Sequence, residues 1–162
     1  MARPSWKDLV RVRVSAQPEG LWNMVVPYVY GPRLLQLTVV AKDDKGKDVS
    51  KKWKLSGTEE ECSPDGSLEN GTPQQQSLLV STAPRGAMVG KIGGSTADLP
   101  DTSPAGAAGP YAGRKVFVSG TYTVVGLAST DCGPLFLTMN DSPKGFCNHS
   151  GDLWVLIEEA PL

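Results

Sequence analysis

The sequence predicts an all-β protein, a β-sandwich of the jelly-roll type. Its 162 residues include 18 glycines and 13 prolines. These are spread along the chain and are the poorest residues for a helix interior. Between them lie short segments in which β-branched and other apolar residues alternate with polar ones, which is typical of half-buried strands. Many short strands with regular turn signals indicate a sandwich or jelly roll, and one domain over residues 1–162 is expected.

The first third of the chain predicts three strands, a turn and a returning strand. Asp8–Val14 carries three valines on one side and two arginines on the other. Leu21–Tyr30 is apolar but contains a proline, which predicts an edge strand or a bent one. Arg33–Ala41 alternates again, and the turn residues of 43–46 precede a further expected strand at Val49–Leu55.

The remainder predicts six strands and two long loops. The strands are expected at Ser77–Ser81, Ala87–Ile92, Lys115–Val118, Tyr122–Leu127, Leu135–Met139 and Leu153–Glu158. The loops, 56–76 and 94–113, are polar or rich in glycine, proline and alanine. Loops of this length in a compact domain are usually functional or disordered.

Charge and composition exclude several classes of function. The chain has 16 Lys and Arg against 17 Asp and Glu, so it lacks the positive field of a nucleic-acid-binding protein. No run of 18 apolar residues predicts a membrane span. The first residues lack the apolar core of a secretory signal, so we expect a cytoplasmic or non-classically exported protein. Its three cysteines are then expected to be reduced thiols, or to form at most one disulfide.

The segment Asn140–Leu153 gathers the residue types that bind a hard cation. It links two apolar strands and contains a carboxylate, two side-chain amides and turn-forming proline and glycines. Ca²⁺ takes six to eight oxygens from such side chains and from backbone carbonyls. The same residue types also make ordinary turns, so both readings stay open from chemistry alone.

The pattern of this segment resembles the calcium loop of the PA-IL-like family, bacterial galactose-binding lectins with a jelly-roll sandwich. The shared positions are Asn140-Asp141, Pro143, Asn148 and Ser150-Gly151. A second block, Gly86–Gly93, is similar to the family strand that ends in Lys-Ile-Gly. The resemblance extends through the later strands and implies a galactose-binding-like fold.

The resemblance also implies a set of site residues. Asp141 and Asn148 would bind both Ca²⁺ and the sugar, Gly145 would offer its carbonyl to the metal, and Ser142 would line the sugar pocket. His149 stands at a further ligand position, where the family has Asn or Asp. In this mechanism two neighbouring hydroxyls of a galactoside complete the calcium shell, and no bond of the ligand is broken.

Three departures from the family pattern bear on this activity. The imidazole of His149 is a poor ligand for Ca²⁺, which prefers oxygen. The loop 56–76 contains no histidine, whereas the family loop supplies histidine and glutamine contacts to the sugar. The family's metal-binding tyrosine has no counterpart near Lys45–Val49. The family's loop positions also allow a disulfide between Cys62 and Cys147.

Two functions follow from the sequence. The first is a calcium-assisted, galactose-binding lectin that is a homo-oligomer, because several linked sites raise avidity. The second is a structural or interaction module that keeps the fold, has lost sugar binding and uses its long loops as contact surfaces. An enzyme is not expected, because the single histidine has no recognisable nucleophile motif beside it.

Overall fold

The protein is an all-β sandwich, as the sequence predicts. The computed structural model describes residues 4–55, 61–67, 78–96, 115–143, 146 and 149–162. Within them it has ten strands and no α-helix. The strands are β1 (Lys7–Ser15), β2 (Asn23–Tyr30), β3 (Arg33–Val40), β4 (Trp53–Lys54), β5 (Glu61–Cys62), β6 (Met88–Ile92), β7 (Lys115–Val118), β8 (Tyr122–Leu127), β9 (Cys132–Met139) and β10 (Asp152–Pro161).

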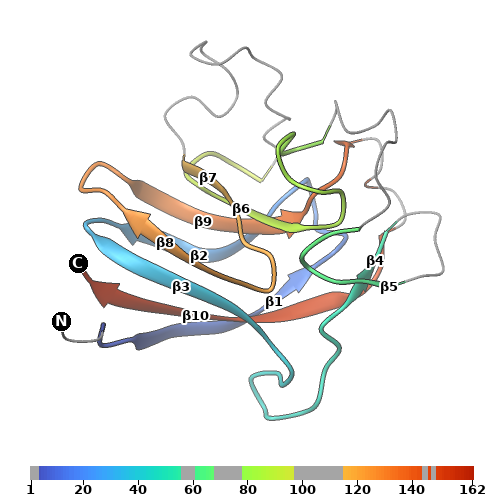
Figure 1. Cartoon of the computed structure of the whole chain (residues 1–162), viewed down its shortest axis with the longest axis horizontal. Helices are drawn as coiled ribbons and strands as arrows, with labels where there is room; N and C mark the ends of the chain where they lie inside the picture. Colours follow the sequence, from blue (N-terminus) through green and yellow to red (C-terminus); the bar gives the residue numbers. More distant parts are fainter. Residues whose placement is uncertain (1–3, 56–60, 68–77, 97–114, 144–145, 147–148) are drawn as a thin grey trace.

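Eight of the strands form two antiparallel sheets that pack face to face (Figure 1). Sheet A has the order β1-β10-β3-β8, and sheet B has the order β2-β9-β6-β7. The short strands β4 and β5 pair with each other beside one end of the sandwich. Both chain termini lie at the opposite end (Figure 1). The β-sandwich is therefore confirmed, while its jelly-roll character stays a prediction.

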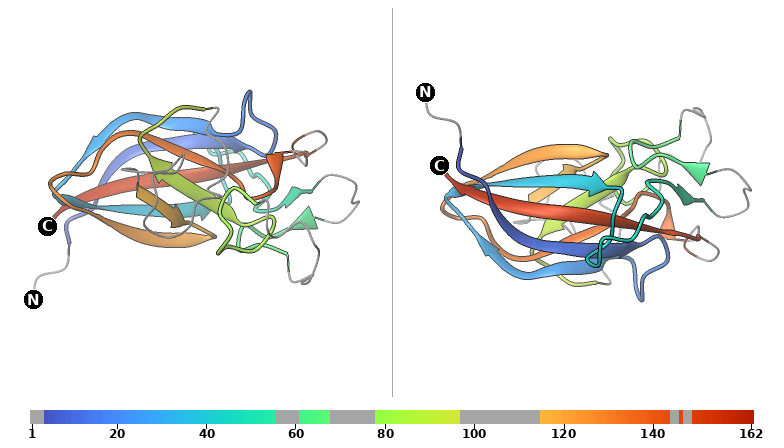
Figure 2. Two further views of the ribbon diagram at one scale, coloured as in Figure 1. Left: turned by 90° about the horizontal axis from the view of Figure 1, so that it is seen from above. Right: turned by 90° about the horizontal axis from the view of Figure 1, so that it is seen from below.

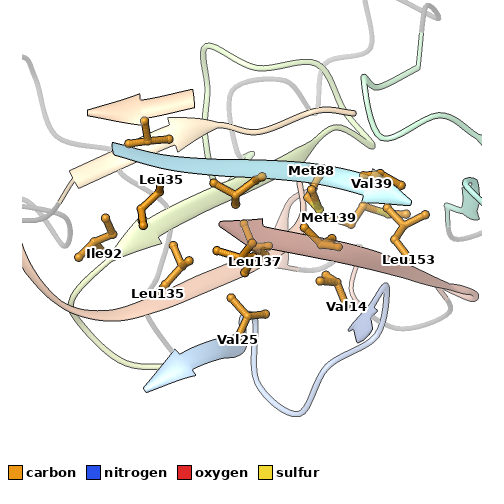
Figure 3. Close-up of a cluster of buried hydrophobic side chains, with 14 of the residues drawn as sticks. Val14, Val25, Leu35, Val39, Met88, Ile92, Leu135, Leu137, Met139 and Leu153 are labelled. Carbon is orange, nitrogen blue, oxygen red and sulfur yellow. The ribbon is translucent and has the colours of Figure 1, made fainter. Parts of the chain in front are cut away.

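The main core lies between the sheets and follows from the alternation of the strands. Inward-facing side chains of sheet A meet those of sheet B, as Figure 3 shows. The labelled residues of this cluster are Val14, Val25, Leu35, Val39, Met88, Ile92, Leu135, Leu137, Met139 and Leu153. Close packing of these groups supplies most of the apolar burial that holds the two sheets together.

A second apolar cluster covers the outer face of sheet B. It joins the outward-facing side chains of β6 and β9 to residues from the surrounding connections: Trp22, Leu79, Val80, Ala83, Val89, Phe136 and Phe146. The fully buried Lys91 lies in the same layer, where its ammonium group donates a 2.6 Å hydrogen bond to the carbonyl of Ser95. Sheet B is thus buried on both faces over much of its area.

Most predicted strands are confirmed, with changes at their ends. Strand β2 is an edge strand of sheet B, with register shifts on both sides of Val26, in agreement with its proline. Strands β9 and β10 are longer than expected. The predicted strand Val49–Leu55 is wrong except for the two residues of β4, which pair with β5 inside the expected loop 56–76.

The predicted strand Ser77–Ser81 is also wrong over its described residues, which form bends. The amide of Leu79 donates to the carbonyl of Asp141, and the amide of Val80 donates to the side chain of Asn140. These backbone groups are satisfied by a loop and a side chain, so the segment needs no neighbouring strand.

Cys62 and Cys132 are free thiols. The disulfide between Cys62 and Cys147 that the family positions allowed is therefore not formed, and Cys147 lies outside the described residues. Burial raises the pKa of the Cys62 thiol, although Arg85 and Trp53 act in the opposite direction. A thiol with a raised pKa is a weak nucleophile at neutral pH.

Candidate functional site

The predicted calcium loop begins where strand β9 ends, and the register of sheet B decides what lies opposite it. Met139 pairs with Met88 in the β6–β9 ladder. The ladder continues beyond the strands, because the amide of Asn140 donates to Ala87 and the amide of Gly86 donates to the carbonyl of Asn140, at 2.8 and 2.7 Å. The antiparallel direction then brings Arg85 beside Asp141.

The carboxylate of Asp141 is almost completely buried and is bound by three groups of the chain. Its Oδ1 accepts hydrogen bonds from Nε of Arg85 at 2.9 Å and from the backbone amide of Ser142 at 2.8 Å. Its Oδ2 lies 2.8 Å from Nε2 of His149 and 3.3 Å from Nη2 of Arg85. We call Arg85, Asp141 and His149 the Asp141 cluster.

Burial and hydrogen bonding act against each other on this carboxylate. Burial is the largest single influence and raises the pKa of Asp141. The hydrogen bonds from His149, Arg85 and Ser142, with the positive charge of Arg85, together outweigh it. The pKa of Asp141 therefore lies below its ordinary value, and the group is a carboxylate at neutral pH.

The ring of His149 is buried with both nitrogens in contact with acceptors. Nδ1 lies 2.9 Å from the carbonyl oxygen of Ala16, which can only accept a hydrogen bond. Nε2 lies 2.8 Å from the carboxylate of Asp141. Each ring nitrogen therefore faces an oxygen of the protein, and the two contacts fix the position of the ring.

The residues around the ring hold it in place. Phe146 packs edge-on against His149, with ring centroids 4.7 Å apart. The side chain of Gln17 donates to the carbonyl of Phe146 at 2.5 Å and accepts from the amide of His149 at 3.2 Å. The residues that follow β1 therefore clamp both described positions of the loop between Pro143 and Ser150.

Asn140 ties the segment 78–87 to the same region. Its Oδ1 accepts the Val80 amide, and its Nδ2 lies 2.9–3.1 Å from the carbonyl oxygens of Val80, Ala83 and Pro84. The side chain is completely buried. An amide with so many backbone partners holds the segment firmly, because any unpaired group would stay buried and unsatisfied.

The far end of the loop closes against strand β4. Ser150 and Lys54 exchange backbone hydrogen bonds of 3.1 and 2.8 Å. Gly151 has a φ of +95°, and a Cβ on it would lie 3.2 Å from Cα of Trp53. Glycine is therefore required here, both for the left-handed backbone and for the close approach to β4.

Three of the predicted site residues come together and two lie outside the described part of the chain. Asp141 and His149 are in direct contact, and Ser142 contributes its backbone amide. Gly145 and Asn148 are not described. Sequence reasoning missed Arg85, which lies 56 residues from Asp141; only the β6–β9 register reveals this pairing.

The contacts of Asp141 do not fit a calcium ion at this carboxylate. Both oxygens already accept hydrogen bonds. The guanidinium of Arg85 and the imidazole of His149 lie where a cation bound to this carboxylate would have to lie. A cation would have to displace one of these groups, and the charge of Arg85 would repel it. Among the described residues, no three His, Cys, Asp or Glu side chains gather as a metal site needs.

The same contacts do not suit acid–base catalysis. A general base needs a nitrogen or oxygen within hydrogen-bond reach of a substrate. The side chain of His149 has no exposed surface, and both of its nitrogens contact groups of the protein. The arrangement can hold charge and rigidity, but it offers no free proton acceptor.

The comparisons with known proteins identify no relative. No protein-family model matches the chain, and no curated protein matches it in sequence. The resemblance to the PA-IL-like family therefore stays a prediction. The described part of the chain contains no helix that is long and apolar enough to cross a membrane.

Proposed function

We propose that this protein is an interaction module with a lectin-like β-sandwich, in which the Asp141 cluster takes over the structural role of a calcium ion. The observation that carries the proposal is the position of Arg85, whose guanidinium contacts both oxygens of Asp141. In this arrangement the positive charge that holds the loop comes from the chain itself.

The physical argument is that Arg85 and His149 can hold the loop in the way that a calcium ion would. A calcium ion would tie Asp141 to neighbouring oxygens and so fix the loop. Arg85 ties the same carboxylate to the start of β6, and His149 ties it to Ala16 after β1. Both links are short, the His149 link is buried and the Arg85 link is partly buried, so the loop is fixed with no need for a bound ion.

The competing proposal is the calcium-assisted lectin that binds galactose-type sugars. The β-sandwich and the convergence of Asp141, Ser142 and His149 on one loop favour it. It requires Asp141 to release Arg85 and to bind Ca²⁺ together with Gly145 and Asn148. The two proposals therefore differ in how the protein responds to calcium.

Thermal unfolding with calcium or with a chelator decides between them. A ligand of the native state at 100 times its Kd adds about 2.7 kcal/mol of stability, enough to raise the Tm by several degrees. The interaction-module proposal expects no such change with millimolar calcium, alone or with galactose. A rise in Tm that Asp141→Asn abolishes and Asp65→Asn keeps would contradict the proposal and support the lectin.

A further inference from the structure

The outer face of sheet A carries an unusual number of apolar side chains. Its strands alternate, so every second residue points away from the core. Among the outward-facing residues, six are apolar: Leu34, Val40, Tyr122, Val124, Trp154 and Leu156. Tyr122 and Val124 are 56% and 44% exposed, and the other four are half-buried.

The strand register places these side chains on one face of three neighbouring strands, interspersed with Thr38, Gln36 and Glu158. Trp154 pairs with Val40 across the β10–β3 ladder. Leu156 pairs with Thr38, which in turn pairs with Tyr122 on β8. Directly paired residues on one sheet face have Cβ atoms about 4.5–5.5 Å apart, so Trp154 and Val40 are neighbours, while Thr38 lies between Leu156 and Tyr122 and Gln36 pairs with Val124.

The two sheets differ in what lies on their outer faces. Sheet B is covered by the cluster of Trp22, Leu79, Phe136 and their neighbours. The view from below in Figure 2 looks onto sheet A, where strands β1, β10 and β3 run across the molecule. Among the described residues, the connection from β3 to β4 contacts sheet A at strand β1, where the guanidinium of Arg11 donates a hydrogen bond to the carbonyl of Lys42.

The polar groups of this face are already paired with one another. The hydroxyl of Tyr122 donates to Gln36 at 2.7 Å, and Gln36 donates to Glu158 at 3.0 Å. At one corner, Arg13 lies 3.6 Å from the carboxylate of Asp152. A partner that covers the face would therefore remove few unpaired polar groups from water, which lowers the cost of docking.

We infer that the outer face of sheet A binds a second copy of this chain, sheet against sheet. The inference rests on the proposed interaction function and names its partner. Four strands spaced about 4.8 Å apart, each with seven or eight residues that rise about 3.3 Å per residue, give a face of about 19 by 25 Å in projection. The side chains on this face make its accessible area larger than the projection. Stable interfaces bury roughly 600–800 Å² per partner.

A second copy matches this face in shape, and its charge opposes pairing little. A twisted sheet packs best on another sheet with the same twist, at about −30°, and an identical sheet provides that twist. The net charge is −1, so two copies repel each other little over long range. Arg11 and Arg13 lie on the edge strand β1, and β8 forms the opposite edge of the sheet. A twofold axis parallel to the strands places β1 of each copy over β8 of the other, so the arginines of the two copies lie far from each other.

A matched pair of variants tests the inference by sedimentation velocity. Val124 on sheet A and Val118 on sheet B are both 44% exposed and both lie on edge strands. The wild type is expected to sediment at twice its 17.2 kDa monomer mass between about 1 and 100 µM, the range of weak to moderate interfaces of this size. Val124→Lys is expected to raise the dimer Kd at least about tenfold, because it faces the basic edge of the partner.

Val118→Lys is expected to sediment like the wild type. A monomeric wild type at all these concentrations, or equal dissociation of the two variants, would overturn the inference. Leu156→Lys serves as a second disruptive variant nearer the centre of the face, and circular dichroism checks the fold of each protein. All samples contain chelator, so a dimer that forms there stands even if the calcium test contradicts the proposed function.

Discussion

The Asp141 cluster and the outer face of sheet A depart from the usual distribution of residues in opposite directions. Charged groups normally lie in water and large apolar groups in the core. In the Asp141 cluster a carboxylate is buried, and on sheet A apolar groups are exposed. Comparing the two indicates which departure stabilises the fold and which one is available to a partner.

The difference lies in where the partners are found. Each polar atom of Asp141 and His149 meets a group of the same chain, so the cluster is complete within one molecule. The apolar side chains on the outer face of sheet A are partly open to water, and Tyr122 and Val124 are the most exposed of them. A feature that is complete by itself contributes to stability, whereas an uncovered apolar surface is a place for binding. Variants at the two places should therefore separate stability from association.

The largest expected effect is on stability and comes from Asp141→Ala. This change leaves His149 buried and Arg85 partly buried without their carboxylate. Breaking a fully buried ion pair costs about 3–5 kcal/mol of unfolding free energy, and because Arg85 is partly exposed the expected loss is at the lower end, about 3 kcal/mol. Urea denaturation at equilibrium measures the loss. Asp48→Ala is the control, because its ion pair with Lys42 is exposed and should contribute at most about 1 kcal/mol. Equal losses in the two variants would contradict the role of the cluster.

His149→Phe should have the next largest effect. Phenylalanine keeps an aromatic ring beside Phe146 but removes the histidine contact to the Ala16 carbonyl and leaves Oδ2 of Asp141 with only its longer contact to Arg85. Buried groups left unpaired cost about 1–3 kcal/mol, measured again with urea. A variant as stable as the wild type would show that packing alone holds this ring.

The pH dependence should show the contribution of Asp141 separately. Its pKa is lower in the folded protein than in the unfolded chain. The stabilisation is therefore complete above about pH 4–5 and is lost as the pH falls through the lowered pKa. The Tm of the wild type should drop more steeply than that of Asp141→Asn between about pH 5 and pH 2. Parallel curves would show that the ionised carboxylate adds nothing.

The smallest effect on stability is expected for Val124→Lys. An exposed position away from packing usually changes the unfolding free energy by less than about 0.5 kcal/mol. The variant should unfold like the wild type at low protein concentration, where both are monomers. At high concentration only the wild type should gain in Tm, because self-association stabilises the native state. A concentration-dependent Tm in the variant would place the interface elsewhere.

The fold could be predicted because alternation is a local signal. Strands β1, β3 and β8 each show apolar residues at every second position, and each formed close to its expected bounds. The segment 78–81 has a similar composition but forms no strand. Its backbone partners are Asn140 and Asp141, about sixty residues away, and no local pattern records such a pairing.

The site was predictable only in part for the same reason. The loop after β9 stood out by its carboxylate, amides and glycines, and the family resemblance singled out Asp141 and His149, which the structure brings into contact. What the loop binds depends on Arg85, and a single arginine in a turn carries no signal of its own. Its partner follows from the register of β6 against β9, which is a property of the folded sheet.

Asn140 also helps to keep the outer face of sheet B covered. Its buried amide holds Val80 and Ala83, which belong to the layer over sheet B. If Asn140 were replaced and this layer lifted, both sheets would expose an apolar outside. A molecule with one such surface forms a closed pair, whereas one with two can add copies without end and grow into a filament. If sheet A pairs as we infer, replacing Asn140 is therefore expected to turn a finite pair into an open-ended polymer.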